Sequence, residues 1–82
     1  MLPVVKTMSS RQRSLICFGK NVRRLRGASG FTQERLADRA DLDPTYISGI
    51  ERGIRNPTLI ILVRLAKALG VPLSELCKGI RW

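Results

Sequence analysis

The chain has 82 residues, of which 44% are hydrophobic and 26% are charged, a composition typical of one small globular domain. It contains no histidine, which removes the usual general base, the Ser-His triads and the commonest zinc ligand, so an enzyme is a poor first hypothesis. No apolar run approaches the roughly 20 residues that span a bilayer, and a transmembrane protein is therefore excluded.

The net charge of +9 is unevenly placed along the chain. Residues 1–33 carry seven Lys and Arg residues and no acid, whereas five of the 6 acidic residues lie between Glu34 and Glu51. This separation favours a polyanionic partner, with an anionic membrane surface as the weaker candidate. A basic face that is merely solvated is the alternative. The low aromatic content of 5% argues against recognition of single-stranded bases by stacking.

Residues 1–12 show no hydrophobic periodicity, so we expect an N-terminal arm there, followed by one folded domain over residues 13–82. An amphipathic helix is predicted from about Ser14 to Arg26. Its apolar residues recur at steps of three and four and are Leu15, Phe18, Val22 and Leu25. The glycines that follow are expected to end this helix.

Two short helices are predicted next. Thr32 can cap a helix over residues 33–40, because its hydroxyl can accept a hydrogen bond from a free backbone N–H. Asp43 and Pro44 are suited to begin the following helix, which runs to about Arg52. The glycine after it favours the left-handed conformation that ends a helix. Two helices of this length joined by about three residues form a helix-turn-helix.

Two further helices are predicted from the same kinds of capping and helix-ending residues. Thr58 can cap a helix that ends at Gly70, and a shorter helix is predicted from Leu73 to about Lys78. No segment alternates between apolar and polar residues with a period of two, as a half-buried strand would. The chain is therefore predicted to be all-α, with five helices.

The helix after Thr58 carries more apolar residues than one core face needs. The residues expected on its core face are Leu59, Leu62, Leu65, Ala66 and Leu69. At about 100° per residue, Ile60 points nearly away from that face, with Ile61 and Val63 on its flanks. Such surplus apolar residues on a small domain indicate an interface. A solitary exposed isoleucine without a partner is the alternative.

Several of these elements together match the pattern of a known family. In chain order they are Thr32-Gln33-Glu34 with Leu36-Ala37, Ile47-Ser48 with Ile50-Glu51 and Gly53, Pro57, and Leu69-Gly70-Val71. At this spacing, residues 15–77 resemble the lambda-repressor/Cro-like (XRE) helix-turn-helix family. Within that family, the run DLDPTYISGIERGIRNPT is most similar to the controller proteins of restriction–modification systems, which are small dimeric transcription regulators.

The resemblance implies a compact five-helix bundle of the lambda-repressor-like DNA-binding type. It also implies a sequence-specific regulator of transcription that binds double-stranded DNA as a homodimer on a palindromic operator. Each subunit would lay the helix over residues 44–52 in the major groove. No cofactor, metal, small-molecule ligand or membrane partner is implied. The expected location is the bacterial cytoplasm, on the nucleoid, for a chain encoded by a bacterium or a phage.

The resemblance places the DNA contacts on and around the two helices of the helix-turn-helix. The expected contact residues are Thr32, Gln33, Pro44, Thr45, Tyr46, Ser48, Gly49, Arg52, Arg55 and Asn56. Gln33 and Arg55 would bind phosphates, and Arg52 a phosphate or a guanine edge. Gly49 would allow close approach to a base pair, with tight packing against the preceding helix as the alternative. Tyr46 is equally suited to base contact and to half-burial.

Other roles also follow from the resemblance. Relatives dimerise through their last two helices, so the expected interface residues are Ile60, Ile61, Leu73, Ile80 and Trp82. Arg26 and Glu51 correspond to an ion pair within the fold, and a catalytic carboxylate is not expected. Cys17 and Cys77 lie far apart, with no CxxC motif, so reduced thiols are expected and a disulfide or redox switch is the alternative.

Other functions fit parts of the sequence. A phage-type repressor, or the antitoxin of a toxin–antitoxin pair, would use the same fold to bind DNA. A helical adaptor for protein interactions would keep the fold without reading DNA, but the polar residues of the 44–52 helix together with Arg55 favour DNA. A protein that binds RNA or an anionic membrane would account for the charge, but not for the capped helix-turn-helix.

Overall fold

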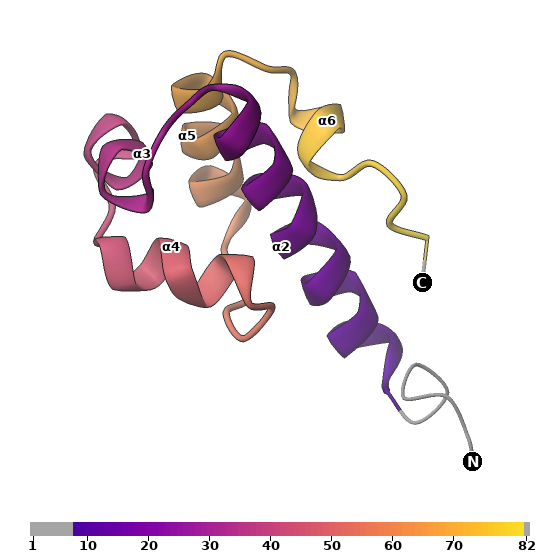
Figure 1. Cartoon of the computed structure of the whole chain (residues 1–82). Helices are drawn as coiled ribbons and strands as arrows, with labels where there is room; N and C mark the ends of the chain where they lie inside the picture. The colour runs from indigo at the N-terminus through magenta and orange to yellow at the C-terminus, as the bar shows by residue number, and fades with distance from the viewer. Residues whose placement is uncertain (1–7, 82) are drawn as a thin grey trace.

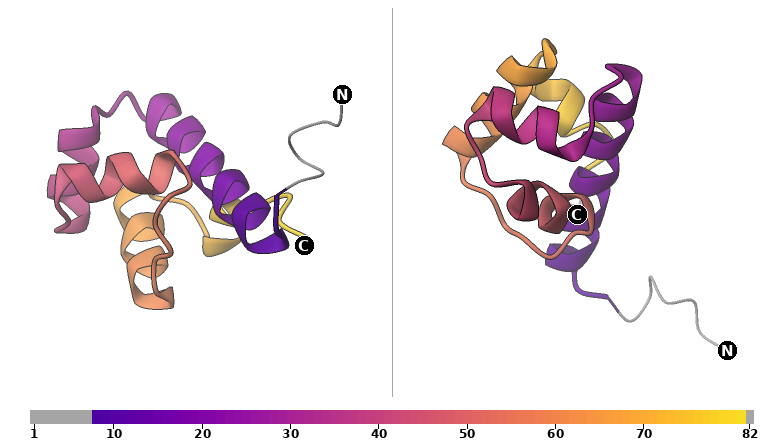
Figure 2. Two further views of the ribbon diagram at one scale, coloured as in Figure 1. Left: turned by 90° about the horizontal axis from the view of Figure 1, so that it is seen from below. Right: turned by 60° about the vertical axis from the view of Figure 1, so that its left-hand side comes forward.

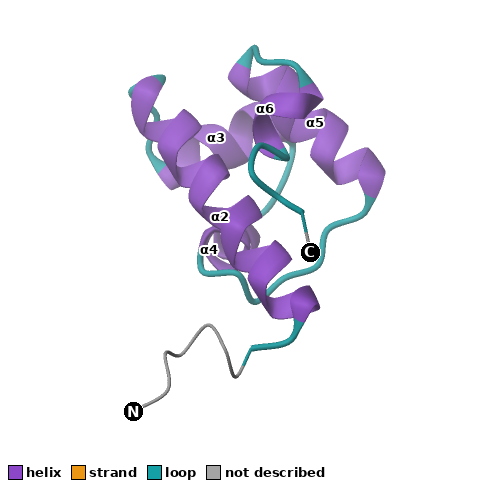
Figure 3. Ribbon diagram, turned by 90° about the vertical axis from the view of Figure 1, so that its right-hand side faces the viewer, coloured by secondary structure: helices purple, strands orange, loops and turns teal. Residues whose placement is uncertain are grey.

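The chain folds into five helices in a computed structural model that describes residues 8–81, with no strand in that range (Figure 3). The helices are α2 (Ser10–Ala28), α3 (Gln33–Ala40), α4 (Pro44–Glu51), α5 (Leu59–Leu69) and α6 (Leu73–Leu76). Figure 1 shows α2 as the long diagonal helix, with α3 and α4 on one side of it and α6 on the other. The prediction of an all-α fold with five helices is confirmed.

Helix α2 begins earlier than the hydrophobic periodicity predicts, at Ser10 rather than near Ser14. The backbone N–H of Gln12 donates to Ser9 Oγ at 3.1 Å, and the backbone N–H of Ser9 donates to Gln12 Oε1 at 2.9 Å. This reciprocal capping box pairs N–H groups that a helix start leaves free, and it extends α2 beyond its apolar face. The expected arm therefore loses its last residues to α2, and residues 1–7 lie outside the described residues.

The predicted N-cap residues of α3, α4 and α5 all act as caps. Each accepts a hydrogen bond from a backbone N–H of the first turn, at 3.0 Å for Thr32, 2.8 Å for Asp43 and 3.4 Å for Thr58. Asp41 ends α3 in the left-handed conformation, with a φ of 55° that aspartate tolerates better than most residues. This conformation lets the chain change direction within the short link between α3 and α4.

Helix α6 ends at Leu76, sooner than the expected end near Lys78. The buried side-chain amide of Asn21 donates hydrogen bonds to the Leu76 carbonyl at 2.9 Å and to the Lys78 carbonyl at 2.8 Å. These carbonyls pair with α2 instead of accepting bonds along a longer α6. The C-terminal segment then runs beside α2, where Cys17 Sγ donates to the Lys78 carbonyl at 3.6 Å (Figure 1).

The core lies where the five helices meet. Its largest fully buried side chains are Val22, Leu36, Ile47, Ile50, Leu65 and Leu76. On α2, the predicted apolar face is buried at Phe18, Val22 and Leu25, and Leu15 is half-buried. Every helix contributes to one continuous cluster, which fixes the orientation of the helix-turn-helix.

The start of α5 lies outside this core, which corrects one prediction, although Ile61 and Leu62 pack against the core partly buried. Leu59, expected on the core face, is 64% exposed. The buried residues of α5 begin only at Leu65, because the first turns of α5 project beyond the helices that cover its second half (Figure 2). Ile60, predicted to point outward, is 66% exposed.

Two arginines link α5 to α3 by hydrogen bonds. Part of the net positive charge is therefore used within the fold. Arg39 Nε donates to the Ala68 carbonyl at 3.1 Å, and its guanidinium lies 5.0 Å from the centre of the Phe31 ring. Arg64 Nε donates to the Ala40 carbonyl at 3.0 Å. The carbonyls at these helix ends therefore have cationic partners, which suits the negative end of a helix dipole.

Candidate nucleic-acid interface

Helix α4 has an apolar inner face and a polar outer face. The inner face consists of Ile47 and Ile50, which are both 0% exposed. The outer face consists of Thr45, Ser48 and Arg52, which lie together because residues three, four and seven apart share one side of a helix. Thr45 and Arg52 are exposed and Ser48 is half-buried. The domain therefore holds α4 from one side and leaves the other side open to a partner.

A buried ion pair fixes the end of α4 to α2. Arg26 Nε donates to Glu51 Oε2 at 2.6 Å, and Arg26 Nη2 donates to Glu51 Oε1 at 3.0 Å. The Glu51 side chain is only 4% exposed, so this bidentate pairing compensates the loss of hydration. The hydrogen bond with Glu51 raises the pKa of Arg26, which keeps its charge. This is the pair that the sequence predicts.

Gln33, expected to bind a phosphate, is turned toward this ion pair. Its Nε2 donates to Glu51 Oε1 at 3.1 Å, a link that the sequence reasoning missed. The side-chain amide has two N–H donors, so one remains for a phosphate. The backbone N–H groups at the start of α3, beside the exposed cap Thr32, can also meet an anion.

Helices α2 and α4 approach each other closely at Gly19. A Cβ at this position would overlap the Ile50 carbonyl oxygen and would lie 2.8 Å from the Glu51 carbonyl oxygen. The backbone of α4 therefore rests on α2 where only glycine fits. The sequence reasoning gave Gly19 no role. The available signal was a glycine in a helix interior, where it costs about 1 kcal/mol relative to alanine.

At the start of α4, Thr45 is oriented by the cap. Its hydroxyl donates to Asp43 Oδ1 at 2.6 Å, beside the backbone N–H of the same residue at 2.8 Å. These two bonds, the side-chain bond first, lower the pKa of Asp43. The hydroxyl oxygen of Thr45 keeps its acceptor capacity, and its methyl group remains available to an apolar contact. Pro44 is exposed beside it.

A second cluster lies beside the outer face and consists of Tyr46, Gly49 and Arg55. Tyr46 is half-buried and packs against the core. The Arg55 guanidinium carbon lies 6.0 Å from the centre of the Tyr46 ring. Gly49 is buried, and a Cβ there would lie 2.7 Å from Arg55 Cγ. The three atoms nearest to such a Cβ all belong to Arg55, in the loop after α4, and none belongs to the preceding helix.

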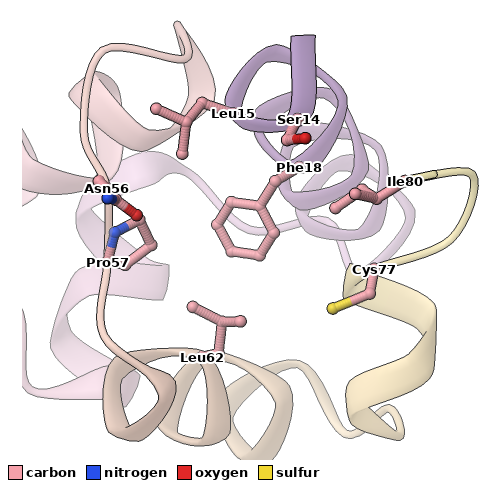
Figure 4. Close-up of a pocket in the computed structure, with 8 residues that line it drawn as sticks. All are labelled: Ser14, Leu15, Phe18, Asn56, Pro57, Leu62, Cys77 and Ile80. Atoms are coloured by element: carbon pink, nitrogen blue, oxygen red, sulfur yellow. The ribbon is translucent and has the colours of Figure 1, made fainter. Parts of the chain in front are cut away.

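The remaining expected DNA contacts are exposed. Arg52 Nε makes a long hydrogen bond of 3.4 Å to the Ser48 carbonyl, so its guanidinium stays near the outer face. Asn56 is exposed at the rim of a small pocket between α2, α5 and α6 (Figure 4). The pocket has a volume of about 140 Å³. Its lining is mainly apolar, with Phe18 and Leu62 among the side chains that point into it.

Within the described residues, no three His, Cys, Asp or Glu side chains come together as a metal site would require. Cys17 and Cys77 are both free thiols and half-buried. No helix within residues 8–81 has the length and apolar character needed to cross a membrane.

The residues expected at the dimer interface differ in how far they are buried. Ile60 is exposed, whereas Ile61, Leu73 and Ile80 are partly buried against the domain's own core. Trp82 lies outside the described residues. Two more apolar residues on the same half of α5 are exposed: Val63, expected beside Ile60, and Leu59, expected in the core. Ile54, in the loop before α5, is also exposed, at 62%.

Known proteins are similar to this chain in sequence and in fold. The helix-turn-helix family HTH_3 matches residues 22–76, more than half of the chain. The HTH-type transcriptional regulator y4dJ of Sinorhizobium fredii is 50% identical over 58 residues, which cover 71% of this chain and 75% of that protein. The control protein C.BamHI of Bacillus amyloliquefaciens is 47% identical over 62 residues, which cover 74% and 76%.

A solved structure gives the same result. The crystal structure of the restriction–modification controller protein C.AhdI from Aeromonas hydrophila has a TM-score of 0.77 and 44% identity, covering 78% of this chain and 97% of that one. The chain therefore belongs to the HTH_3 helix-turn-helix family and is a DNA-binding transcription regulator related to the restriction–modification controller proteins.

Proposed function

We propose that this chain is a homodimeric controller of transcription that binds a palindromic operator, with α4 in the major groove of each half-site. One observation carries this proposal. The two isoleucines of the inner face are fully buried, while the outer face presents Thr45, Ser48 and Arg52. A helix that is held rigidly from one side and is polar on the other is suited to enter a groove.

The proposed DNA contacts are of two kinds, to base edges and to phosphates. Thr45, Ser48 and Arg52 contact base edges, because a hydroxyl can bond to several bases and an arginine can bond guanine with two N–H groups. Phosphates are bound at the start of α3 by Thr32 and Gln33 and beyond α4 by basic and polar side chains. Those last side chains are Arg55 and Asn56. Phosphate contacts position the helix, and base contacts supply specificity.

The first half of α5 supports the homodimer. Residues 59–63 are all apolar, and Leu59, Ile60 and Val63 are 64%, 66% and 47% exposed. A cluster of this kind on a small domain marks an interaction surface. In a dimer with two-fold symmetry, the same face of a second copy covers it. We place Ile60 at its centre, with the half-buried Ile61, Leu73 and Ile80 along its margin.

The relatives support a biological setting for this regulator. C.BamHI is named a control protein and C.AhdI a restriction–modification controller protein. We therefore propose that this chain regulates the genes of a restriction–modification system in a bacterial cytoplasm, with no enzymatic activity of its own. Methyltransferase and endonuclease genes beside its own gene are expected, whereas a neighbouring toxin gene or phage genes would contradict this setting.

Selection of bound duplexes from a random pool tests DNA reading. The parent protein should enrich one palindromic sequence. Arg52→Ala should lower affinity for it by about 10- to 100-fold and relax the preference at one position of each half-site, since a bidentate base contact contributes about 1–3 kcal/mol. Arg24→Ala, the same change at an exposed position of α2, is the control and should leave base preferences unchanged. A pool without enrichment would contradict the proposal.

Sedimentation tests the homodimer separately. The parent should sediment with the mass of two chains at micromolar concentration. Ile60→Asp should halve that mass, because a carboxylate cannot be buried without a partner. Lys67→Asp, an exposed change on the second half of the same helix, should leave the mass unaltered. A monomeric parent would refute the proposed dimer.

A further inference from the structure

We propose that Gly49 positions Arg55 for contact with DNA. The absent side chain of Gly49 leaves a notch in the outer face of α4, and the stem of Arg55 lies in this notch. The guanidinium is thereby held beside Tyr46. This inference rests on the proposed DNA-reading role of α4, and it makes Gly49 a positioning residue rather than a DNA contact.

Gly49 is buried although it lies on the outward side of α4. Gly49 lies four residues after Thr45, so the two residues share the outward side of α4. Thr45 is exposed, yet Gly49 is buried. A glycine on the side of a helix that faces away from the core would be open to solvent unless another segment covered it.

The side chain of Arg55 covers Gly49. From the place where a Cβ would be at Gly49, Arg55 Cγ is 2.7 Å away, Nε is 3.2 Å away and Cδ is 3.5 Å away. Three successive atoms of one side chain therefore lie along the glycine. A methyl group at position 49 would occupy the space of this stem.

The backbone after α4 brings Arg55 back over the helix. The N–H of Ile54 donates to the Gly49 carbonyl at 3.0 Å, and the N–H of Gly53 donates to the Ile50 carbonyl at 3.0 Å. These bonds reverse the chain at the end of α4. Gly53 has a φ of 77°, which this reversal requires and which other residues rarely adopt.

Tyr46 holds the other end of the side chain. The Arg55 guanidinium carbon is 6.0 Å from the ring centre, within the range of a cation–π contact. A guanidinium that lies against a ring still directs N–H groups outward in its own plane, toward a phosphate or a base edge. Fixing a long side chain before binding reduces the conformational entropy that binding would otherwise cost.

The substitution Gly49→Ala separates this role from folding. Alanine is a better helix former than glycine, so α4 should remain intact. The nearest obstacle is an exposed side chain, which can rotate away. The expected result is a folded protein in which Arg55 has left the notch.

A double-mutant cycle on the selected operator measures the coupling. Gly49→Ala should lower affinity by about tenfold when Arg55 is present and by less than about twofold in the Arg55→Ala background, because residues in contact show non-additive effects. An equal loss in both backgrounds would mean that Gly49 itself contacts DNA and would overturn the proposal. No loss in either background would overturn it as well.

A measurement without DNA keeps this inference distinct from the proposed function. In the free protein, NMR signals of the Arg55 side chain should carry a ring-current shift from Tyr46. Gly49→Ala should move these signals to values typical of a solvated arginine and leave those of Arg52 in place. The control is Gly27→Ala, since a Cβ at Gly27 would have no atom within 4 Å. Unchanged Arg55 signals in Gly49→Ala would overturn the inference, whether or not the protein binds DNA.

Discussion

Gly19 of α2 and Gly49 of α4 are both buried glycines in helix interiors, yet they serve different regions of the molecule. A Cβ at Gly19 would meet the backbone carbonyls of Ile50 and Glu51, so Gly19 determines where α4 lies. A Cβ at Gly49 would meet only the side chain of Arg55 among its three nearest atoms. The neighbour decides the outcome of adding a methyl group: backbone carbonyls yield only if two helices move apart, whereas an exposed side chain can rotate away.

The same division extends to the charged groups around α4. The inner contact holds Arg26, Glu51 and Gln33 in one hydrogen-bonded group, where the Glu51 side chain is 4% exposed. On the outer face, Arg52 is exposed and bonds only weakly to its own helix. In the proposed function, stability and DNA binding are therefore carried by opposite sides of α4, and single substitutions should separate them.

The largest expected effect lies in the inner contact. Glu51→Ala should lower the free energy of unfolding by about 3–5 kcal/mol, because Arg26 would keep a largely buried charge without its partner. Urea denaturation followed by circular dichroism measures this loss. Asp38→Ala removes the same charge from an exposed position of α3 and should change stability by less than about 0.5 kcal/mol. Similar losses in the two variants would show that the ion pair does not fix α4.

A smaller effect is expected where the helices touch. Gly19→Ala should lower the free energy of unfolding by about 1–3 kcal/mol, since α2 and α4 must move apart to admit the methyl group. Gly27→Ala, on the same helix, should be neutral or stabilising by up to about 1 kcal/mol, because a Cβ there meets no atom within 4 Å. If Gly19→Ala proved as stable as Gly27→Ala, the close approach of α2 and α4 would not determine the position of α4.

The smallest effect concerns the exposed start of α4. Hydrogen bonds from Thr45 lower the pKa of Asp43, so the folded state favours the charged carboxylate. Its contribution is present above the ordinary aspartate pKa of about 4 and is lost as the pH falls through the lower folded value. Asp43→Asn should therefore flatten the pH dependence of stability slightly in this acidic window. A parent and variant with identical pH profiles would contradict the assigned cause.

Local patterns predicted much of this molecule. The caps Thr32, Asp43 and Thr58 follow from residue type and spacing. The early start of α2 was also encoded, in Ser9 and Gln12, but the apolar periodicity begins later and concealed it. Local signals of this kind depend only on neighbours in sequence.

Features set by distant residues were missed. Helix α6 ends early at Leu76, where Asn21 of α2 donates hydrogen bonds to the carbonyls of Leu76 and Lys78. The exposure of Leu59 was missed because hydrophobic periodicity identifies the core face of α5. It does not show how far the other helices extend along that face. The cover over Gly49 depends on how the loop after α4 folds back, which no spacing in the sequence shows.

Titration of the isotope-labelled protein with its selected operator duplex, followed by NMR, tests whether the outer face of α4 binds DNA. The largest changes in amide and side-chain signals are expected on the outer face of α4 and in its following loop, at Thr45, Ser48, Arg52 and Arg55. Changes confined to the exposed basic residues of α2, with α4 unaffected, would contradict this expectation.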